Sequence, residues 1–218
     1  MNAKLLTDLL AGQFICEIAF EQEYELLSDP EVRAEVELWL ASIDRRLAQL
    51  GEDGAYFVAP MQIMAPHAAK VREDLKRFRD VYGPSVRMLN LIREAKDGFS
   101  CSPGDYVQLA DIEGSINESS TLESHLRSMH SAIAGVSIKH SNREFLKRML
   151  ENLTDSGYLV LSNPQNETYR VTGKIDHLHA ALEFISEHEP VIASAPEDEA
   201  QTEDLVLKAT LQTGESDV

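Results

Sequence analysis

The chain has 218 residues, and hydrophobic residues make up 43% of them, so a packed core is expected and global disorder is excluded. Its 37 Asp and Glu residues outnumber its 20 Lys and Arg residues, which leaves a formal net charge of −17. Such a chain is repelled by free nucleic acid and by anionic membranes unless basic side chains are segregated on one face. The same acidity is also an ordinary contribution to solubility.

The N-terminus and the cysteines indicate a cytoplasmic protein. Asp8 interrupts the first apolar run, so no signal peptide is predicted. No uninterrupted apolar stretch approaches the roughly 20 residues that span a bilayer. Cys16 and Cys101 lie far apart among apolar neighbours. This placement predicts buried, unreactive thiols rather than a disulfide or a metal site.

The first half of the chain predicts helices that alternate with short strands. A helix is expected over 4–11, ended by Gly12, and a brief strand over 13–16. The motif Ser-Asp-Pro-Glu at 28–31 combines capping-box spacing, a second candidate cap and a proline suited to the first turn. The helix that follows is expected to run to Gly51. Its apolar stripe would include Val32, Val36, Trp39, Leu40, Ile43, Leu47 and Leu50.

A strand over 54–59 and a long helical pattern over 66–96 follow, and the Gly-Pro pair at 83–84 is expected to break or kink this pattern. A loop at 98–103 marks a plausible boundary between units. Further along, the pattern predicts an amphipathic segment over 105–116 with a turn at Gly114. A helix over 120–133 is expected to begin with a Ser120–Glu123 capping box. A second capping box, Ser141–Glu144, opens the next helix, whose apolar face would consist of Phe145, Leu146, Met149, Leu150 and Leu153. Strands over 158–161 and 168–171 and a helix over 174–186 follow.

The order of these elements indicates the architecture. In two places a long amphipathic helix ends near a glycine and an aromatic-led strand follows, at Tyr56 and at Tyr158. Helices followed by a two-stranded wing are typical of the winged helix. We therefore expect a mostly α fold with small β-wings, that is, tandem winged-helix domains. The N-terminal winged-helix-like domain would span 1–98, the C-terminal one 99–187, and a flexible acidic tail 188–218. A helical protein with incidental hairpins is the alternative.

No pattern in the sequence predicts catalysis or a cofactor. The glycines form neither a phosphate-binding loop nor a dinucleotide fingerprint, and there is no nucleophile-elbow motif. His125 and His130 are five residues apart, and His177 and His179 two apart, so neither pair shares the helical face that a metal pair requires. We expect no catalytic residues, no cofactor and no metal site.

One helix is locally basic in this acidic chain. Lys139, Arg143, Lys147 and Arg148 lie on or just before the helix opened by Ser141. In a winged helix this is the recognition-helix position, so these four residues are candidates for contact with DNA phosphates. The alternative is a solvated surface in which Lys147 pairs with a neighbouring glutamate. Net repulsion predicts that the protein alone binds DNA weakly or not at all.

Four features of the sequence occur together in one known family. They are the stretch from Gly12 to Cys16, the helix around Trp39 leading into Gly54 to Val58, the block from Phe145 to Leu150 that continues through Gly157, Tyr158 and Tyr169 to Thr172, and the acidic tail. In these features the chain resembles the MksE/MukE accessory subunits of bacterial SMC (condensin-like) complexes. The resemblance implies a non-catalytic tandem winged-helix protein that forms a homodimer on a kleisin subunit. It also implies a complex of the MksBEF type with a separate SMC ATPase, located at the nucleoid and acting in chromosome organisation and segregation or in plasmid defence.

Two other classes of function stay open at this point. The first is a winged-helix transcriptional regulator, which would bind duplex DNA by itself with a strong salt dependence. The second is a small enzyme or effector-binding domain that uses the helical region 66–96. The acidity of the chain argues against the regulator, and no cluster of residues supports the enzyme.

Overall fold

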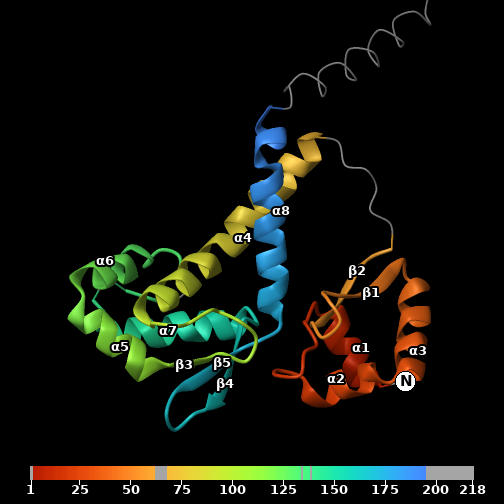
Figure 1. Cartoon of the computed structure of the whole chain (residues 1–218), viewed down its shortest axis with the longest axis horizontal. Helices are drawn as coiled ribbons and strands as arrows, with labels where there is room; N and C mark the ends of the chain where they lie inside the picture. Colours follow the sequence, from red (N-terminus) through yellow and green to blue (C-terminus); the bar gives the residue numbers. More distant parts are fainter. Residues whose placement is uncertain (1, 62–67, 134, 138, 195–218) are drawn as a thin grey trace, which may run out of the picture.

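The computed structural model describes residues 2–61, 68–133, 135–137 and 139–194, of which the side chains of 68–77, 79 and 188–194 are not described. The described part of the chain is mostly helical and carries two small antiparallel sheets, so the expected mostly α class with small β elements is confirmed. The elements form an N-terminal unit (residues 3–60) and a C-terminal unit (residues 68–194). Figure 1 shows the N-terminal unit on the right, the C-terminal unit on the left, and α8 between them.

The N-terminal unit places three helices before a hairpin. Its elements are α1 (Ala3–Leu10), α2 (Glu21–Ser28), α3 (Pro30–Ala41), β1 (Arg45–Gln49) and β2 (Tyr56–Pro60). β1 and β2 pair antiparallel, and Ile15, between α1 and α2, forms an isolated bridge to Tyr56 of β2. The brief strand expected at 13–16 is therefore a single bridged residue on the free edge of β2.

The predicted start of α3 is confirmed, with Asp29 rather than Ser28 as its cap. The Asp29 carboxylate accepts a hydrogen bond from the backbone N–H of Glu31 at 2.8 Å, and Pro30 occupies the first helical position. Proline suits this position because its missing N–H would have no partner within the helix. Ser28 instead ends α2.

The predicted end of this helix is wrong. α3 stops at Ala41. Of the residues expected to extend its stripe, Ile43 lies in the turn before β1, Leu47 in β1 and Leu50 directly after it. The chain reverses at Asp44, whose φ of 57° is left-handed. β1 then pairs with β2 from Arg45 opposite Pro60 to Gln49 opposite Tyr56. The ladder to β2 thus overrides the helical propensity of this arginine- and leucine-containing stretch.

The C-terminal unit repeats the order and adds two helices. Its elements are α4 (Ala68–Ala95), β3 (Tyr106–Gln108), α5 (Leu109–Glu118), α6 (Ser120–Ser128), α7 (Asn142–Asp155), β4 (Leu159–Asn163), β5 (Thr168–Val171) and α8 (Lys174–Ser194). The sheet has the order β3-β5-β4, with both pairs antiparallel. The two units pair their strands in the same way. Ile15, which follows α1, bridges to β2, and β3, which follows α4, pairs with β5, so in each unit the contact is with the second strand of the hairpin.

The prediction for α7 is confirmed in detail. Ser141 and Glu144 form the capping box: the Ser141 side chain accepts from the Glu144 N–H, and the Glu144 carboxylate accepts from the Ser141 N–H at 2.8 Å. The five apolar residues expected on one face are all fully buried. Gly157, which follows the helix, has a φ of 78° that suits glycine. The hairpin of β4 and β5 comes next, as expected.

Four expectations for elements of the C-terminal unit need correction. The segment expected as one amphipathic piece is the strand β3 followed by α5, and Gly114 lies inside α5 rather than at a turn. α6 is capped by Ser119 and ends at Ser128 instead of running to 133. α4 continues as one helix through Pro84, so the Gly-Pro pair at 83–84 does not break it into two helices. α8 extends to Ser194, so the first residues of the expected flexible tail are helical; the rest of that tail, 195–218, lies outside the described residues.

Each unit is built around its own hydrophobic core. The core of the N-terminal unit is formed by Leu5, Leu6, Leu9, Ile15, Leu27, Val36, Leu40 and Tyr56. The core of the C-terminal unit is larger and draws on α4 to α8. It includes Met88, Leu91 and Ile92 of α4, which the expected boundary at 98 assigned to the first domain. By its packing, the second half of α4 is therefore part of the C-terminal unit.

Candidate interaction surfaces

The basic side chains of α7 lie next to carboxylates from two other elements. The Arg143 guanidinium donates to Glu113 of α5 at 2.7 Å and also to Glu167 in the β4–β5 turn. Lys147, one helical turn further, lies 3.5 Å from the same Glu167 carboxylate. Hydrogen bonding to Glu113 and the charge of Glu167 raise the pKa of Arg143. These contacts compensate the charge of both cations within the molecule.

The other two DNA-contact candidates lie apart from this cluster. Arg148 donates to Glu151 of the same helix at 2.9 Å, which is an ordinary helical pairing. Lys139 is exposed, and it lies in the segment before α7. The structure therefore brings together Arg143 and Lys147, and leaves Lys139 and Arg148 outside. Lys147 pairs with Glu167 and not with a glutamate of its own helix, which was the alternative that the sequence left open.

Sequence reasoning missed the residue that holds the beginning of α7. Arg127 of α6 donates to the backbone oxygen of His140 at 2.6 Å and to the Asn142 side chain at 2.5 Å. Its guanidinium also lies 5.6 Å from the centre of the Phe145 ring. No local signal in the sequence points to this role, because its partners lie 13 residues or more further along the chain.

The outer face of α3 differs from that of α7. Val36 and Leu40 point into the N-terminal core, and the opposite side is solvent-exposed. That exposed side carries glutamates and one large hydrophobic residue, Leu38, which is 78% exposed. We define the α3 face as Glu31, Ala34, Glu35, Leu38 and Ser42, which share one side at helical spacing. Its composition is acidic and apolar, without a basic residue.

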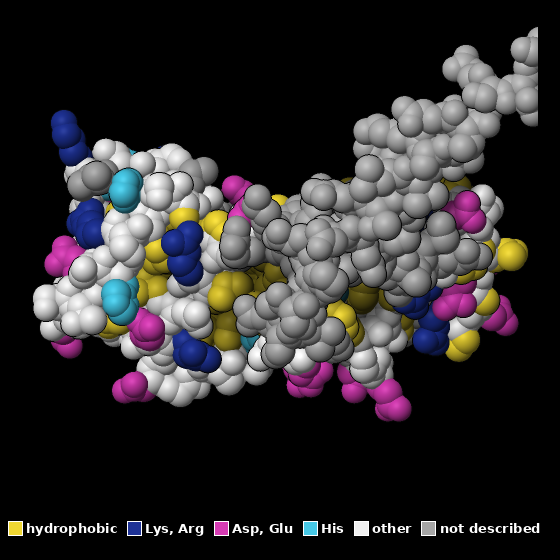
Figure 2. Space-filling view, turned by 90° about the horizontal axis from the view of Figure 1, so that it is seen from above, with side chains coloured by type: hydrophobic (Ala, Val, Ile, Leu, Met, Phe, Trp, Pro, Cys, Tyr) yellow, Lys and Arg dark blue, Asp and Glu magenta, His cyan; other side chains and the backbone are white. Residues whose placement is uncertain are grey.

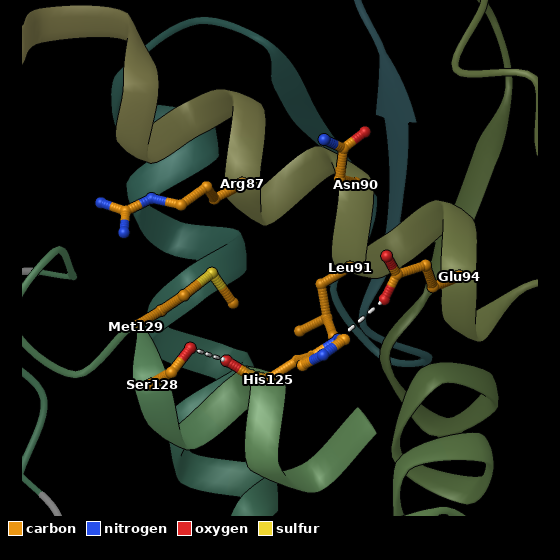
Figure 3. Close-up of a pocket in the computed structure, with 7 residues that line it drawn as sticks. All are labelled: Arg87, Asn90, Leu91, Glu94, His125, Ser128 and Met129. Carbon is orange, nitrogen blue, oxygen red and sulfur yellow. Dashed lines mark hydrogen bonds and ion pairs between the residues drawn. The ribbon is translucent and has the colours of Figure 1, made fainter. Parts of the chain in front are cut away.

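A cleft of about 220 Å³ lies between α4 and α6. Figure 3 shows its lining of Arg87, Asn90, Leu91 and Glu94 from α4 and His125, Ser128 and Met129 from α6 and the turn after it. His125 Nδ1 lies 3.0 Å from a Glu94 carboxylate oxygen, whereas the Ser128 hydroxyl donates to the His125 backbone oxygen at 2.7 Å. Although serine, histidine and a carboxylate gather here, the Ser128 hydroxyl does not contact the imidazole as a nucleophile–base pair requires.

The two units meet at a seam built from the Gly12–Cys16 stretch, β2 and the start of α8. The Phe14 ring stacks on Phe57 at 5.0 Å, and the His177 ring meets both edge-on at 5.0 and 5.2 Å. At Gly173 the backbone N–H donates to the Cys16 sulfur at 3.3 Å. A Cβ added to Gly173 would lie 2.9 Å from the Cys16 Cβ, so this close approach requires glycine.

The seam also encloses two titratable groups of α8. Burial, and then the charge of Lys174, lower the pKa of His177. Burial likewise lowers the pKa of Lys174. The Lys174 ammonium donates to the backbone oxygen of Ser156 at 2.8 Å and lies 5.3 and 5.1 Å from the Phe14 and Tyr158 ring centres. Lys174 thus links a ring of the N-terminal unit to the C-terminal unit.

Both cysteines are buried and unpaired, as expected. Burial raises the pKa of the Cys101 thiol to about 11, so it is protonated and weakly nucleophilic near neutral pH. No group of three or more His, Cys, Asp or Glu side chains that could hold a metal ion occurs in the described part of the chain. Among the helices that the structure describes, none is long and apolar enough to cross a membrane.

Comparison of the chain with protein-family models, with curated proteins and with solved structures yields no match.

Proposed function

We propose that the two units are winged helices in tandem. The supporting observation is the repeated order: a helix, a short strand or bridge, two or more helices, and then a hairpin whose second strand pairs back to the first strand position. A helix-turn-helix followed by a two-stranded wing has this order. The extra helix α6 lengthens the connection in the C-terminal unit without changing the pairing of its strands.

On this basis we propose that the chain is a non-catalytic, kleisin-binding subunit of a bacterial condensin-like SMC complex of the MksBEF type. The repeated order of elements carries the proposal, because it agrees with the fold that the MksE/MukE resemblance implies. The sequence stretches behind the resemblance also have structural roles. The Gly12–Cys16 stretch contributes Phe14 and Cys16 to the seam, and the block that ends at Thr172 leads directly into Gly173, which Cys16 contacts.

The charges of α7 are consistent with a subunit that binds protein rather than free DNA. A phosphate group approaching Arg143 or Lys147 has to compete with Glu113 and Glu167, which already occupy those cations. Specific DNA binding commonly relies on several uncompensated cations. We therefore propose that DNA contact, where it occurs, depends on the assembled complex. In that complex the chain would act as a homodimer on the kleisin, with the SMC ATPase as a further subunit.

An affinity purification of the tagged chain from its native host, analysed by mass spectrometry, tests this function. We expect a kleisin and an SMC ATPase to co-purify. Light scattering on the eluted complex should give two copies of this chain for each kleisin. Recovery of the chain alone, together with tight and salt-sensitive binding to duplex DNA, would overturn the proposal.

A winged-helix transcriptional regulator is the second candidate. The observation in its favour is that Arg143, Lys147 and Arg148 are about half exposed on the helix that precedes the wing. A gel shift of the isolated protein over a range of salt concentrations separates the two candidates. The regulator predicts a steep loss of affinity with salt from a measurable starting affinity, whereas the accessory subunit predicts little binding at any salt concentration.

A further inference from the structure

The cleft between α4 and α6 has an apolar floor and a polar rim. Leu91 and Met129 form the floor and are only 2% and 4% exposed. The lining residues Arg87, Glu94 and His125 are exposed. In Figure 2 hydrophobic side chains are visible between basic, acidic and histidine side chains at the left-hand end of the molecule, where the C-terminal unit lies. The cleft volume of about 220 Å³ equals that of roughly seven water molecules, so the cleft suits a small molecule better than a polypeptide segment.

The two ends of the cleft carry opposite charges that cannot pair with each other. Figure 3 shows Arg87 and Glu94 at opposite ends of the lining, with Leu91 and Met129 between them. Residues seven apart in a helix are separated by about 10 Å along its axis, whereas ion pairs within a helix join residues three or four apart. The cleft therefore has a positive end, an apolar middle and a negative end.

Both charged groups can still make hydrogen bonds. Within the described residues, the Arg87 guanidinium has neither a hydrogen bond nor an ion pair, although the chain has 37 acidic side chains against 20 Lys and Arg. One oxygen of Glu94, Oε2, lies 3.0 Å from His125 Nδ1, and the other, Oε1, has no partner in the described part of the chain. A guanidinium offers five N–H donors, and a carboxylate accepts on both oxygens. A ligand that meets both groups thus gains a charge-assisted hydrogen bond at each end.

We propose that this cleft is a binding site for a small linear zwitterion, that is, a molecule with a carboxylate at one end and an ammonium group at the other. The ligand carboxylate accepts from Arg87, the ammonium group donates to the free oxygen of Glu94, and a methylene chain between them covers Leu91 and Met129. A simple anion leaves Glu94 unused, and a simple cation leaves Arg87 unused. The inference goes beyond the proposed function, because neither the kleisin nor DNA enters it.

Three probes with the same carbon chain separate the contributions of the two ends. They are 6-aminohexanoate, which carries both charges, hexanoate, which lacks the ammonium group, and hexylamine, which lacks the carboxylate. Titration of the isotope-labelled full chain, followed by two-dimensional NMR, measures each affinity and locates the site. We expect 6-aminohexanoate to bind with a dissociation constant of about 1 mM or lower, as for a ligand of about nine non-hydrogen atoms. Each singly charged probe should bind about tenfold more weakly. The amide signals that shift should belong to 87–94 and 125–129.

Variants that neutralise one end should remove the preference for the matching end of the ligand. Arg87→Gln should weaken the binding of 6-aminohexanoate about tenfold, to the level of hexylamine, and Glu94→Gln should weaken it to the level of hexanoate. Arg93→Gln on α4 and Glu118→Gln on α5 make the same charge changes at exposed positions outside the cleft. These two controls should change the affinity less than about twofold.

The comparison of the three probes on wild type decides the inference even if a variant unfolds. Equal affinities for the three probes, or amide shifts outside the cleft, would overturn it. Equal losses in the cleft variants and in their controls would overturn it as well. Arg87→Lys keeps the positive charge, so it should retain the preference for 6-aminohexanoate over hexylamine. A complete loss of that preference would contradict an electrostatic contact at this end of the cleft.

Discussion

The helices that precede the two hairpins, α3 and α7, occupy the same place in the order of elements but differ in their outer surfaces. Both are capped by a side chain at the N-terminus, Asp29 or Ser141, and both bury an apolar stripe. On the outside, α7 presents cations neutralised by glutamates of α5 and of the β4–β5 turn. The outer surface of α3 presents carboxylates around the exposed Leu38.

The comparison shows that the order of elements and the surface chemistry vary independently. The buried stripe and the cap define a helix and orient it, and these features are common to both units. The outer residues do not have to fill a core or cap a helix. The outer surface of α3 is therefore acidic and apolar, whereas the basic side chains on the outer surface of α7 are paired with glutamates of the same molecule.

The largest effect is expected in the core beneath α7. Phe145 is fully buried, so Phe145→Ala should lower the free energy of unfolding by about 3–5 kcal/mol through lost burial and a residual cavity. Urea denaturation followed by circular dichroism measures this loss. Leu38→Ala on the outside of α3 is the control and should change stability by less than about 0.5 kcal/mol. A large loss in the control would mean that Leu38 belongs to a core.

Next in size is the seam between the units. Gly173→Ala forces a Cβ against Cys16 and Ala55 and should cost about 1–3 kcal/mol of stability by overpacking. Gly114→Ala is the matched control, since a Cβ there meets no atom within 4 Å and lies inside α5. That change should stabilise by about 0.5–1 kcal/mol. In urea denaturation, the free energy of unfolding should fall for Gly173→Ala and rise for Gly114→Ala. Equal changes in the two variants would contradict the close packing of Gly173 against Cys16.

Removal of the cap of α7 should have a smaller effect. Ser141→Ala deletes one arm of the capping box and should cost about 1 kcal/mol, measured from the midpoint of urea denaturation. Ser120→Ala makes the same chemical change at a helical residue that is not a cap, because Ser119 caps α6. It should be neutral within about 0.5 kcal/mol. A loss at Ser120 as large as that at Ser141 would argue against this assignment of the caps.

The seam also predicts a pH dependence. Because burial and Lys174 lower the pKa of His177 in the folded state, the unfolded chain takes up the proton first as the pH falls. The stability contributed by the neutral ring is complete above the ordinary histidine pKa of about 6.5 and is lost as the pH falls toward the folded value. Denaturation of wild type and His177→Phe between about pH 5 and 8 should show the steeper acid loss in wild type. If the free energy of unfolding changes with pH in the same way in both proteins, His177 does not cause the loss of stability in acid.

The smallest effect on stability is expected for the ion cluster on α7. Glu113→Gln/Glu167→Gln removes the charge that compensates Arg143 and Lys147, and half-exposed ion pairs contribute at most about 1 kcal/mol. The affinity of this double variant for duplex DNA should nevertheless be higher than that of wild type. The slope of the logarithm of its binding constant against the logarithm of the salt concentration should be steeper by about 1–2. The charge-matched control Glu118→Gln/Glu183→Gln should leave the slope unchanged. Equal slopes in both variants would mean that α7 does not contact DNA.

Local signals were enough to predict parts of the fold. α7 and its hairpin follow from a capping box, a regular apolar stripe, a glycine with positive φ and two short strands, all within about 30 residues. α1 ends at Leu10, and Gly12, the predicted stop, lies directly after its cap Ala11, so this helix follows from the same kind of signal. At the site, the four basic candidates were located on or near α7. The carboxylate partners of Arg143 and Lys147 on α5 and on the β4–β5 turn were not foreseen, because they come from distant parts of the chain.

The sequence by itself determined the mostly α class, the acidic balance and the elements whose caps and apolar periodicity lie close together, because neighbouring residues set those signals. The tertiary structure alone decided that 45–49 is a strand, since pairing with β2 outweighs helix propensity. It also decided that Gly173 must be a glycine, and that Arg143 faces two glutamates, because both depend on distant residues brought into contact.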